Sequence, residues 1–133
     1  MHLFLILPFP PSVNGLFSGK SRRFTSSGYR AWQNEATEAL IGQDIKPVGG
    51  NTIITYGFQR PDKRQRDVQN YIKAVSDFLV DRSIITDDSL TLAEYPYWLN
   101  EHGNGVLINI YGVDDINTPN QIASIIHATL VKD

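Results

Sequence analysis

The sequence predicts a single α+β domain built around a mixed β-sheet, with its elements in the order β-α-β-α-β-β-α. Three observations support this prediction. The chain has 133 residues, which is the size of one domain. Hydrophobic residues make up 41% of the sequence and charged residues 20%, as in soluble globular proteins. Apolar runs with strand character alternate with segments of helical periodicity, so residues 1–133 are expected to fold as one domain.

In the first half of the chain, two predicted strands flank a loop and a helix. Residues 2–7 form a short apolar run that ends at a proline-rich segment, which predicts a buried strand. Residues 12–27 are rich in serine, glycine and basic residues and are expected to form a loop. Ser27 is a suitable N-cap for a helix over 28–42, and residues 52–59 predict a second strand. The expected buried face of the helix consists of Trp32, Ala36, Ala39 and Leu40.

The second half of the chain predicts a helix, two strands and a last helix. Apolar residues recur with helical spacing over 68–81; they are Val68, Tyr71, Ile72, Val75, Phe78 and Leu79. Residues 90–98 and 105–111 have strand character, and the polar loop between them predicts a β-hairpin. The last helix is expected to begin at Thr118, which opens a capping-box pattern with proline at the first helical position. Its expected apolar face consists of Ile122, Ile125, Ile126 and Leu130.

The composition excludes several classes of protein. The chain has no cysteine, which rules out disulfides, cysteine-ligated zinc and thiol nucleophiles. The apolar run at residues 3–7 is too short to cross a membrane and lacks the flanking features of a signal peptide. We therefore expect a cytoplasmic protein without a membrane segment.

The charges are unevenly distributed along the chain. The formal net charge is −2, but most of the 12 basic residues fall in two segments. The first contains Lys20, Arg22, Arg23 and Arg30, and the second contains Arg60, Lys63, Arg64 and Arg66. A net charge averages over the whole surface and hides such local patches. Each segment is either a solvated face or a surface that binds nucleic acid.

Acidic residues lie close to the second basic segment. Asp67 is placed at the junction between this segment and the predicted helix, where it is either a helix cap or a carboxylate ligand for Mg²⁺. The two roles are compatible. Asp87 and Asp88 precede a predicted strand and are either solvated turn residues or part of the same acidic site.

One face of the predicted helix over 68–81 carries polar residues. Asn70, Lys73 and Asp77 recur at three- and four-residue steps, so they share this face. Lys73 is either an exposed helix lysine or a group that stabilises negative charge on a phosphate. The three histidines, His2, His102 and His127, have no metal-ligand spacing and are expected to be structural or exposed.

Three segments together resemble the RusA family of Holliday junction resolvases. The first is Pro8 to Asn14 (Pro-Phe-Pro-Pro-Ser-Val-Asn), and the second is Arg64 to Lys73 (Arg-Gln-Arg-Asp-Val-Gln-Asn-Tyr-Ile-Lys). The third is the Asp87–Asp88 pair. The resemblance covers nearly the whole chain and includes the order and separation of the motifs.

The resemblance implies a phage- or prophage-type endonuclease of the bacterial cytosol that acts in DNA recombination and repair. It implies a homodimer that nicks four-way DNA junctions symmetrically and uses Mg²⁺, for which Mn²⁺ can substitute. The catalytic residues implied are Asp67, Lys73 and Asp88. The metal ligands implied are Asp67, Gln69, Asp87 and Asp88. The DNA-contacting residues expected are Asn14, Lys20, Arg22, Arg23, Arg60, Lys63, Arg64, Arg66 and Asn70.

One position departs from the family pattern, Asp-x-Asp-Asn, because Gln69 stands where the second aspartate belongs. A glutamine carbonyl oxygen still coordinates a hard cation, but the site loses a negative charge. The alternative interpretation is therefore a junction-binding protein that has lost nuclease activity. A third interpretation is a structural or phage-assembly protein, which would leave the two basic segments unexplained.

Overall fold

The computed structural model contains one four-stranded mixed sheet and two α-helices. It describes residues 1–18, 24–113, 123–124 and 127. The strands of the main sheet are β1 (His2–Pro8), β4 (Thr52–Arg60), β5 (Thr91–His102) and β6 (Gly105–Gly112), in the order β1-β6-β4-β5. The helices are α1 (Ser27–Leu40) and α2 (Ile72–Asp81). The expected α+β class is confirmed for the described residues, while the last helix, expected from Thr118, lies largely outside them.

Shorter elements connect the helices and strands. They are the 3₁₀ turns η1 (Val13–Gly15), η2 (Val68–Tyr71) and η3 (Asp88–Leu90), and a small sheet of β2 (Phe17–Ser18) and β3 (Phe24–Thr25). The region expected to be a loop, residues 12–27, therefore contains η1, β2 and β3. The helix expected over 68–81 is present, but η2 forms its first turn. Ser26, not Ser27, caps α1, because its side chain accepts a hydrogen bond from the Tyr29 amide at 3.1 Å.

β4 is one of the two inner strands of the sheet, and its position shows that the expected hairpin is wrong. β4 pairs with β6 in antiparallel and with β5 in parallel orientation, so β4 lies between the two strands expected to pair with each other. Every residue of β4 from Thr52 to Phe58 is buried, which is typical of a strand covered on both faces and paired on both edges. The Gly103 amide donates to the Arg60 carbonyl at 3.0 Å, so the end of β4 is enclosed by the turn between β5 and β6.

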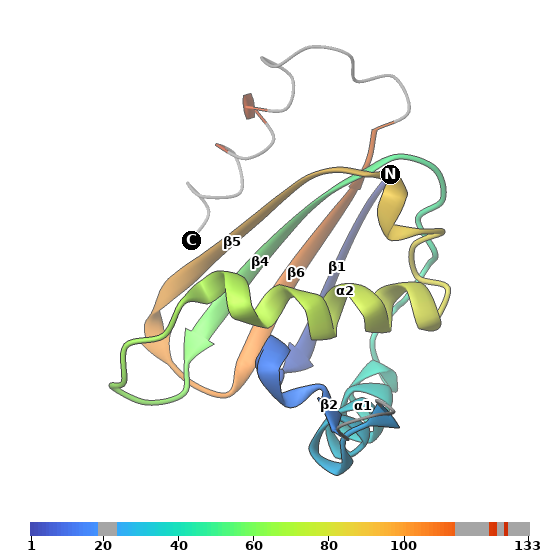
Figure 1. Cartoon of the computed structure of the whole chain (residues 1–133). Helices are drawn as coiled ribbons and strands as arrows, with labels where there is room; N and C mark the ends of the chain where they lie inside the picture. Colours follow the sequence, from blue (N-terminus) through green and yellow to red (C-terminus); the bar gives the residue numbers. More distant parts are fainter. Residues whose placement is uncertain (19–23, 114–122, 125–126, 128–133) are drawn as a thin grey trace.

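The core lies between one face of the sheet and the two helices. Alternate sheet residues such as Leu5, Tyr56 and Ile108 have an exposed fraction of 0%. From α2, Phe78 packs into the same cluster and contacts the Trp32 ring of α1 edge-on at 5.4 Å. Burial of each large apolar side chain stabilises the fold by about 1.5–3 kcal/mol. α2 thus has a fixed position across the sheet (Figure 1).

The parallel pairing of β4 and β5 determines where the two ends of α2 lie. Parallel strands must be joined by a crossover, and here α2 runs back across the sheet between them. Figure 1 shows the loop after β4 at one end of the sheet and η3 at the opposite end, where β5 begins. The residues that precede α2 and those that follow it are therefore separated by the length of the helix.

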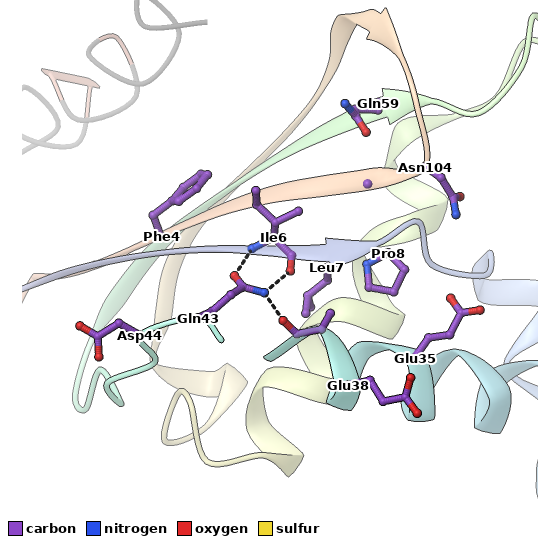
Figure 2. Close-up of a pocket in the computed structure, with 12 residues that line it drawn as sticks. Phe4, Ile6, Leu7, Pro8, Glu35, Glu38, Gln43, Asp44, Gln59 and Asn104 are labelled. Carbon is purple, nitrogen blue, oxygen red and sulfur yellow. Dashed lines mark hydrogen bonds between the residues drawn. The ribbon is translucent and has the colours of Figure 1, made fainter. Parts of the chain in front are cut away.

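β1 forms one edge of the sheet, and a side chain covers part of that edge. The Gln43 amide accepts from the Ile6 N–H and donates to the Ile6 carbonyl, both at 2.8 Å, and also donates to the Ala39 carbonyl (Figure 2). Gln43 therefore satisfies the same backbone groups that an added strand would pair with.

An open pocket of about 1040 Å³ lies beside this edge. Phe4 and Ile6, which are 47% and 45% exposed, line one side of it. Glu35 and Glu38 line the other side, and no basic residue is among the described residues that line it (Figure 2). Its acidic wall makes this pocket unsuited to bind phosphate groups.

The contribution of the Gln43 side chain to stability can be measured directly. Gln43→Ala removes both hydrogen bonds to Ile6 and is expected to lower the free energy of unfolding by about 1–2 kcal/mol. It should also promote association into larger species, because the exposed strand edge is free to pair with another chain. Denaturant unfolding and sedimentation velocity measure the two effects. The matched control is Gln65→Ala, in an exposed loop; equal behaviour of the two variants would contradict the role assigned to Gln43.

Candidate functional site

Asp67 lies at the N-terminal end of the helical segment that contains α2. It is the N-cap of η2, and its Oδ1 accepts a hydrogen bond from the Gln69 amide at 3.1 Å. The Asn70 amide donates to the Asp67 carbonyl at 3.1 Å. The predicted capping role is confirmed. A carboxylate has about four acceptor positions, so the cap leaves capacity for a cation, and both Asp67 and Gln69 are exposed.

An aromatic cluster holds this end of the helix on the sheet. Tyr71, in η2, lies 4.9 Å from the ring of Phe9 and 6.2 Å from the rings of Phe58 and Trp98. Such ring pairs contribute about 0.5–1.5 kcal/mol each beyond the burial of their area. Phe9 belongs to the proline-rich segment, so this cluster joins two of the sequence motifs.

Lys73 and Asn14 line one pocket beside the start of α2. Lys73 forms an ion pair with Asp77 at 3.1 Å, which confirms that these two residues share a helix face. A pocket of about 530 Å³ is lined by Val13, Asn14, Phe17 and Lys73. The two motifs thus present an ammonium and an amide to one pocket, a combination that suits a phosphate and its attached nucleoside.

The segment that carries Asn14 is fixed by hydrogen bonds to the start of α1. The Ser26 hydroxyl donates to the Gly15 carbonyl at 2.6 Å, and the Ser26 amide donates to the Leu16 carbonyl at 2.9 Å. Leu16 is fully buried. Ser26 therefore caps α1 and anchors η1 at the same time, which sets the position of Asn14 relative to Lys73.

Asp87 and Asp88 lie at the other end of α2. Asp87 caps η3, and its Oδ1 accepts from the Ser89 amide at 3.0 Å. This hydrogen bond, with one from Asp88, lowers the pKa of Asp87. The pKa of Asp88 is raised by its hydrogen bond to Asp87, by partial desolvation and by the negative charges of Asp87 and Asp77. The two carboxyl groups therefore compete for one proton.

A polar pocket beside Asp88 contains residues that the sequence analysis did not identify. The pocket has a volume of about 490 Å³, and Ser76 and Glu94 line it together with Asp88. The buried Tyr56 hydroxyl donates to Glu94 at 2.9 Å. Burial and the neighbouring Glu94 charge raise the pKa of Tyr56 well above its ordinary value, so the phenol stays a donor. Glu94 lies in β5, whose pairing with β4 was not predicted, so the sequence gave no sign that Glu94 is near Tyr56.

The structure does not bring the acidic residues of the two ends together within one chain. Ser76, which lines the pocket of Asp88, is nine positions after Asp67 (67 to 76). At a rise of about 1.5 Å per residue, this separation is about 14 Å along the helix axis. The described residues contain no group of three or more histidine, aspartate or glutamate side chains that could hold a metal ion. The proposed donors suit Mg²⁺ chemically, but those of a single chain do not fit one ion.

The second basic segment carries an acidic partner that the sequence analysis overlooked. Arg66 donates to both carboxylate oxygens of Asp62, and the Arg64 guanidinium lies 3.5 Å from the same carboxylate. The Arg66 hydrogen bonds, with one from the Arg64 amide at 2.9 Å, hold the pKa of Asp62 well below its usual range. The Arg60 guanidinium lies 4.9 Å from the centre of the Trp98 ring. Asp62 thus reduces the positive charge of this segment and orients Arg66.

Among the described residues, the other basic residues and the histidines lie outside the two pockets lined by Lys73 and by Asp88. Lys63 is exposed, and Lys20, Arg22 and Arg23 lie outside the described residues. His2 is hydrogen-bonded to Asn109 at 2.7 Å and stacks on Tyr111, as expected for a structural histidine. Among the helices in the described part of the chain, none has the length and apolar character needed to cross a membrane.

Comparison with known proteins adds one match. Residues 8–111, more than half of the chain, match the family model described as Endodeoxyribonuclease RusA. The matched range includes η1, the helical segment with Asp67 and Lys73, and η3 with Asp88. No curated protein sequence matches the chain.

The coupling between Asp87 and Asp88 can be measured directly. Asp87→Asn removes a negative charge next to Asp88 and is expected to lower the pKa of Asp88 toward the ordinary aspartate value. Carboxyl carbon shifts followed by NMR across a pH titration report this change. Asp44→Asn, in an exposed turn after α1, serves as the control and should leave the Asp88 titration unchanged. An unchanged Asp88 titration in Asp87→Asn would show that the two groups are independent.

Proposed function

We propose that this chain, which belongs to the RusA endodeoxyribonuclease family, resolves four-way (Holliday) DNA junctions as a homodimer by Mg²⁺-dependent hydrolysis. The single observation that best supports the proposal is that Lys73 and Asn14 line one pocket. These residues come from separate family motifs, and Asp67 lies on the same helical segment, within two turns of Lys73.

Lys73 is the residue that we assign to the scissile phosphate. Its ammonium is exposed on the surface of α2, and the ion pair with Asp77 fixes its direction. Positive charge held in place before the reaction stabilises the additional negative charge that develops on phosphate in the transition state. Asp77 is assigned as a positioning residue for Lys73, because its carboxylate contacts the lysine and its negative charge disfavours contact with phosphate.

The remaining polar and basic residues are assigned to binding of the DNA backbone. Asn14 and Asn70 offer amides near Lys73, while Arg60, Lys63, Arg64 and Arg66 precede Asp67. Lys20, Arg22 and Arg23 extend this set as a proposal from sequence alone. Neutralisation of phosphates by such side chains releases counterions, so binding is expected to weaken as salt is raised.

The cofactor that we propose is Mg²⁺, with Mn²⁺ as a substitute. The candidate ligands are Asp67, Gln69, Asp87 and Asp88, all of them exposed. Carboxylate and amide oxygens are the donors that a hard cation prefers. A bound divalent ion supplies Lewis-acid chemistry at the phosphate, which the chain's own side chains lack.

A second candidate function follows from Gln69. Gln69 is exposed at the start of η2 and supplies a neutral oxygen where the family pattern has a carboxylate. A protein of this kind would bind four-way junctions in a salt-dependent manner and would show no Mg²⁺-dependent nicking. Binding to linear duplex with equal affinity would instead favour a structural or assembly role.

The roles assigned to individual residues predict a separation of binding from cleavage. Asp67→Asn and Asp88→Asn are expected to abolish cleavage of a four-way junction while junction affinity is kept. Lys73→Gln should lower the single-turnover cleavage rate by about 10²–10³-fold, because it removes charge that acts mainly in the transition state.

The matched control for these variants is Lys46→Gln. Lys46 is an exposed lysine in the segment after α1, with Asp44 at 3.9 Å, and is not among the residues assigned to the site. It should leave both cleavage and binding unchanged. Equal losses of binding and cleavage in the three site variants would contradict the assignment of catalytic roles, and an active Asp88→Asn variant would exclude Asp88 from the site.

A further inference from the structure

We propose that the pocket beside β1 is a docking surface for a basic amphipathic helix of another protein. The partner places apolar side chains on Phe4 and Ile6, and basic side chains against Glu35 and Glu38. The inference is independent of the proposed function, because none of the described residues that line this pocket is assigned to DNA, to the metal or to the scissile phosphate.

The apolar side of the pocket is formed by the outward positions of β1. Phe4 and Ile6 alternate along the strand with Leu3, Leu5 and Leu7, which are buried in the core, so the two sets lie on opposite faces of the sheet. An edge strand that faces only water commonly carries charged side chains, which prevent association. Here the outward positions carry phenylalanine and isoleucine, both nearly half exposed, and contact with a second apolar surface would remove them from water.

The backbone at this edge is closed to an added strand. Gln43 occupies both the amide and the carbonyl of Ile6, and Pro8 at the end of β1 has no N–H to donate. A partner must therefore bind through side chains, as an amphipathic helix does in a groove. Phe4 and Ile6 are two residues apart on a strand, or about 6.6 Å, which is close to the rise of about 6 Å between helix residues four positions apart.

The acidic side of the pocket determines the charge of the partner. Glu35 and Glu38 are exposed on α1, about one helical turn apart, and Asp44 is exposed in the segment after α1. None of the described residues that line the pocket is basic (Figure 2). Three carboxylates beside an apolar surface favour a partner that carries lysine or arginine next to its apolar face, and they disfavour an acidic partner.

The same charges disfavour other occupants of the pocket. DNA is a polyanion and is repelled by the acidic side. Residues 114–133 of this chain contain three aspartates and one lysine, so their formal charge has the same sign as that of the pocket. A second copy would have to use the basic residues between Arg60 and Arg66, which are assigned to DNA.

A designed helical peptide tests the surface. The probe is a fluorescent alanine-based peptide with leucine at positions i, i+4 and i+7 and arginine at i+1, i+5 and i+8, and its binding to the full chain is followed by anisotropy. Two control peptides carry glutamate in place of arginine or serine in place of leucine. The arginine peptide is expected to bind at least about tenfold more tightly than either control. Equal binding of the three peptides, or no binding, would overturn the proposal.

Paired variants locate the bound peptide. Phe4→Thr and Glu38→Lys are each expected to weaken its binding at least about fivefold, because one removes an apolar contact and the other reverses a charge. The matched controls are Leu92→Thr, at an apolar residue that is 48% exposed on β5, and Asp81→Lys, at the end of α2. All four positions are exposed, so the fold is expected to be retained. Losses as large in the controls as in the pocket variants would overturn the proposal.

Self-association through this surface is distinguished by sedimentation velocity. The proposal predicts that the natural protein and Phe4→Thr have the same oligomeric state, because the surface is occupied by a different protein. A dimer of the natural protein that dissociates in Phe4→Thr would assign the surface to a second copy of the chain and would overturn the proposal.

Discussion

The parallel pairing of β4 with β5 is the constraint on which the rest of the structure depends. It requires a crossover, and the crossover is the helical segment that begins at Asp67 and continues through α2. The aromatic contacts of Tyr71 hold one end of this segment on the sheet, and Phe78 packs its other half into the core. Asp67, Lys73 and Asp77 therefore have fixed places along one rigid element. This rigidity is what a phosphate-binding site requires of its charged groups.

The surface divides into regions of different charge that suit different partners. The face near Lys73 and Asn14 combines a positive charge with an amide, whereas the pocket beside β1 has an acidic wall and apolar side chains. Polyanionic DNA is expected at the first region and repelled from the second. Asp62 shows that the basic segment is not simply a row of free cations, because one carboxylate holds two arginines in place. Charge counts along a sequence overestimate the field of such a segment.

Much of the fold was accessible from the sequence, because periodicity reports burial directly. The apolar spacing over 68–81 and the run of β-branched and aromatic residues in β4 both reflect the burial of the element that carries them. The hairpin prediction failed because a short connection between two strands does not show that they pair with each other. Here β4, which is buried along most of its length, lies between β5 and β6 and pairs with both. Likewise, the motif residues were identified by type and spacing. The distance between Asp67 and Asp88 could not be predicted from the sequence, because it follows from the parallel register of β4 and β5. Asp62 was missed because its role depends on the loop bending back toward Arg66.

The central claim is that this chain cleaves branched DNA although Gln69 replaces a carboxylate. The most direct measurement is cleavage of a four-way DNA junction across a titration of Mg²⁺ and Mn²⁺, with Gln69→Asp studied beside the natural protein. The account predicts symmetrical nicking by the natural protein, and nicking by Gln69→Asp at lower metal concentration, because an added carboxylate strengthens cation binding. Nicking by Gln69→Asp alone would contradict the claim and identify the natural protein as a junction-binding protein. A protein that neither binds nor cuts the junction would contradict the functional account as a whole.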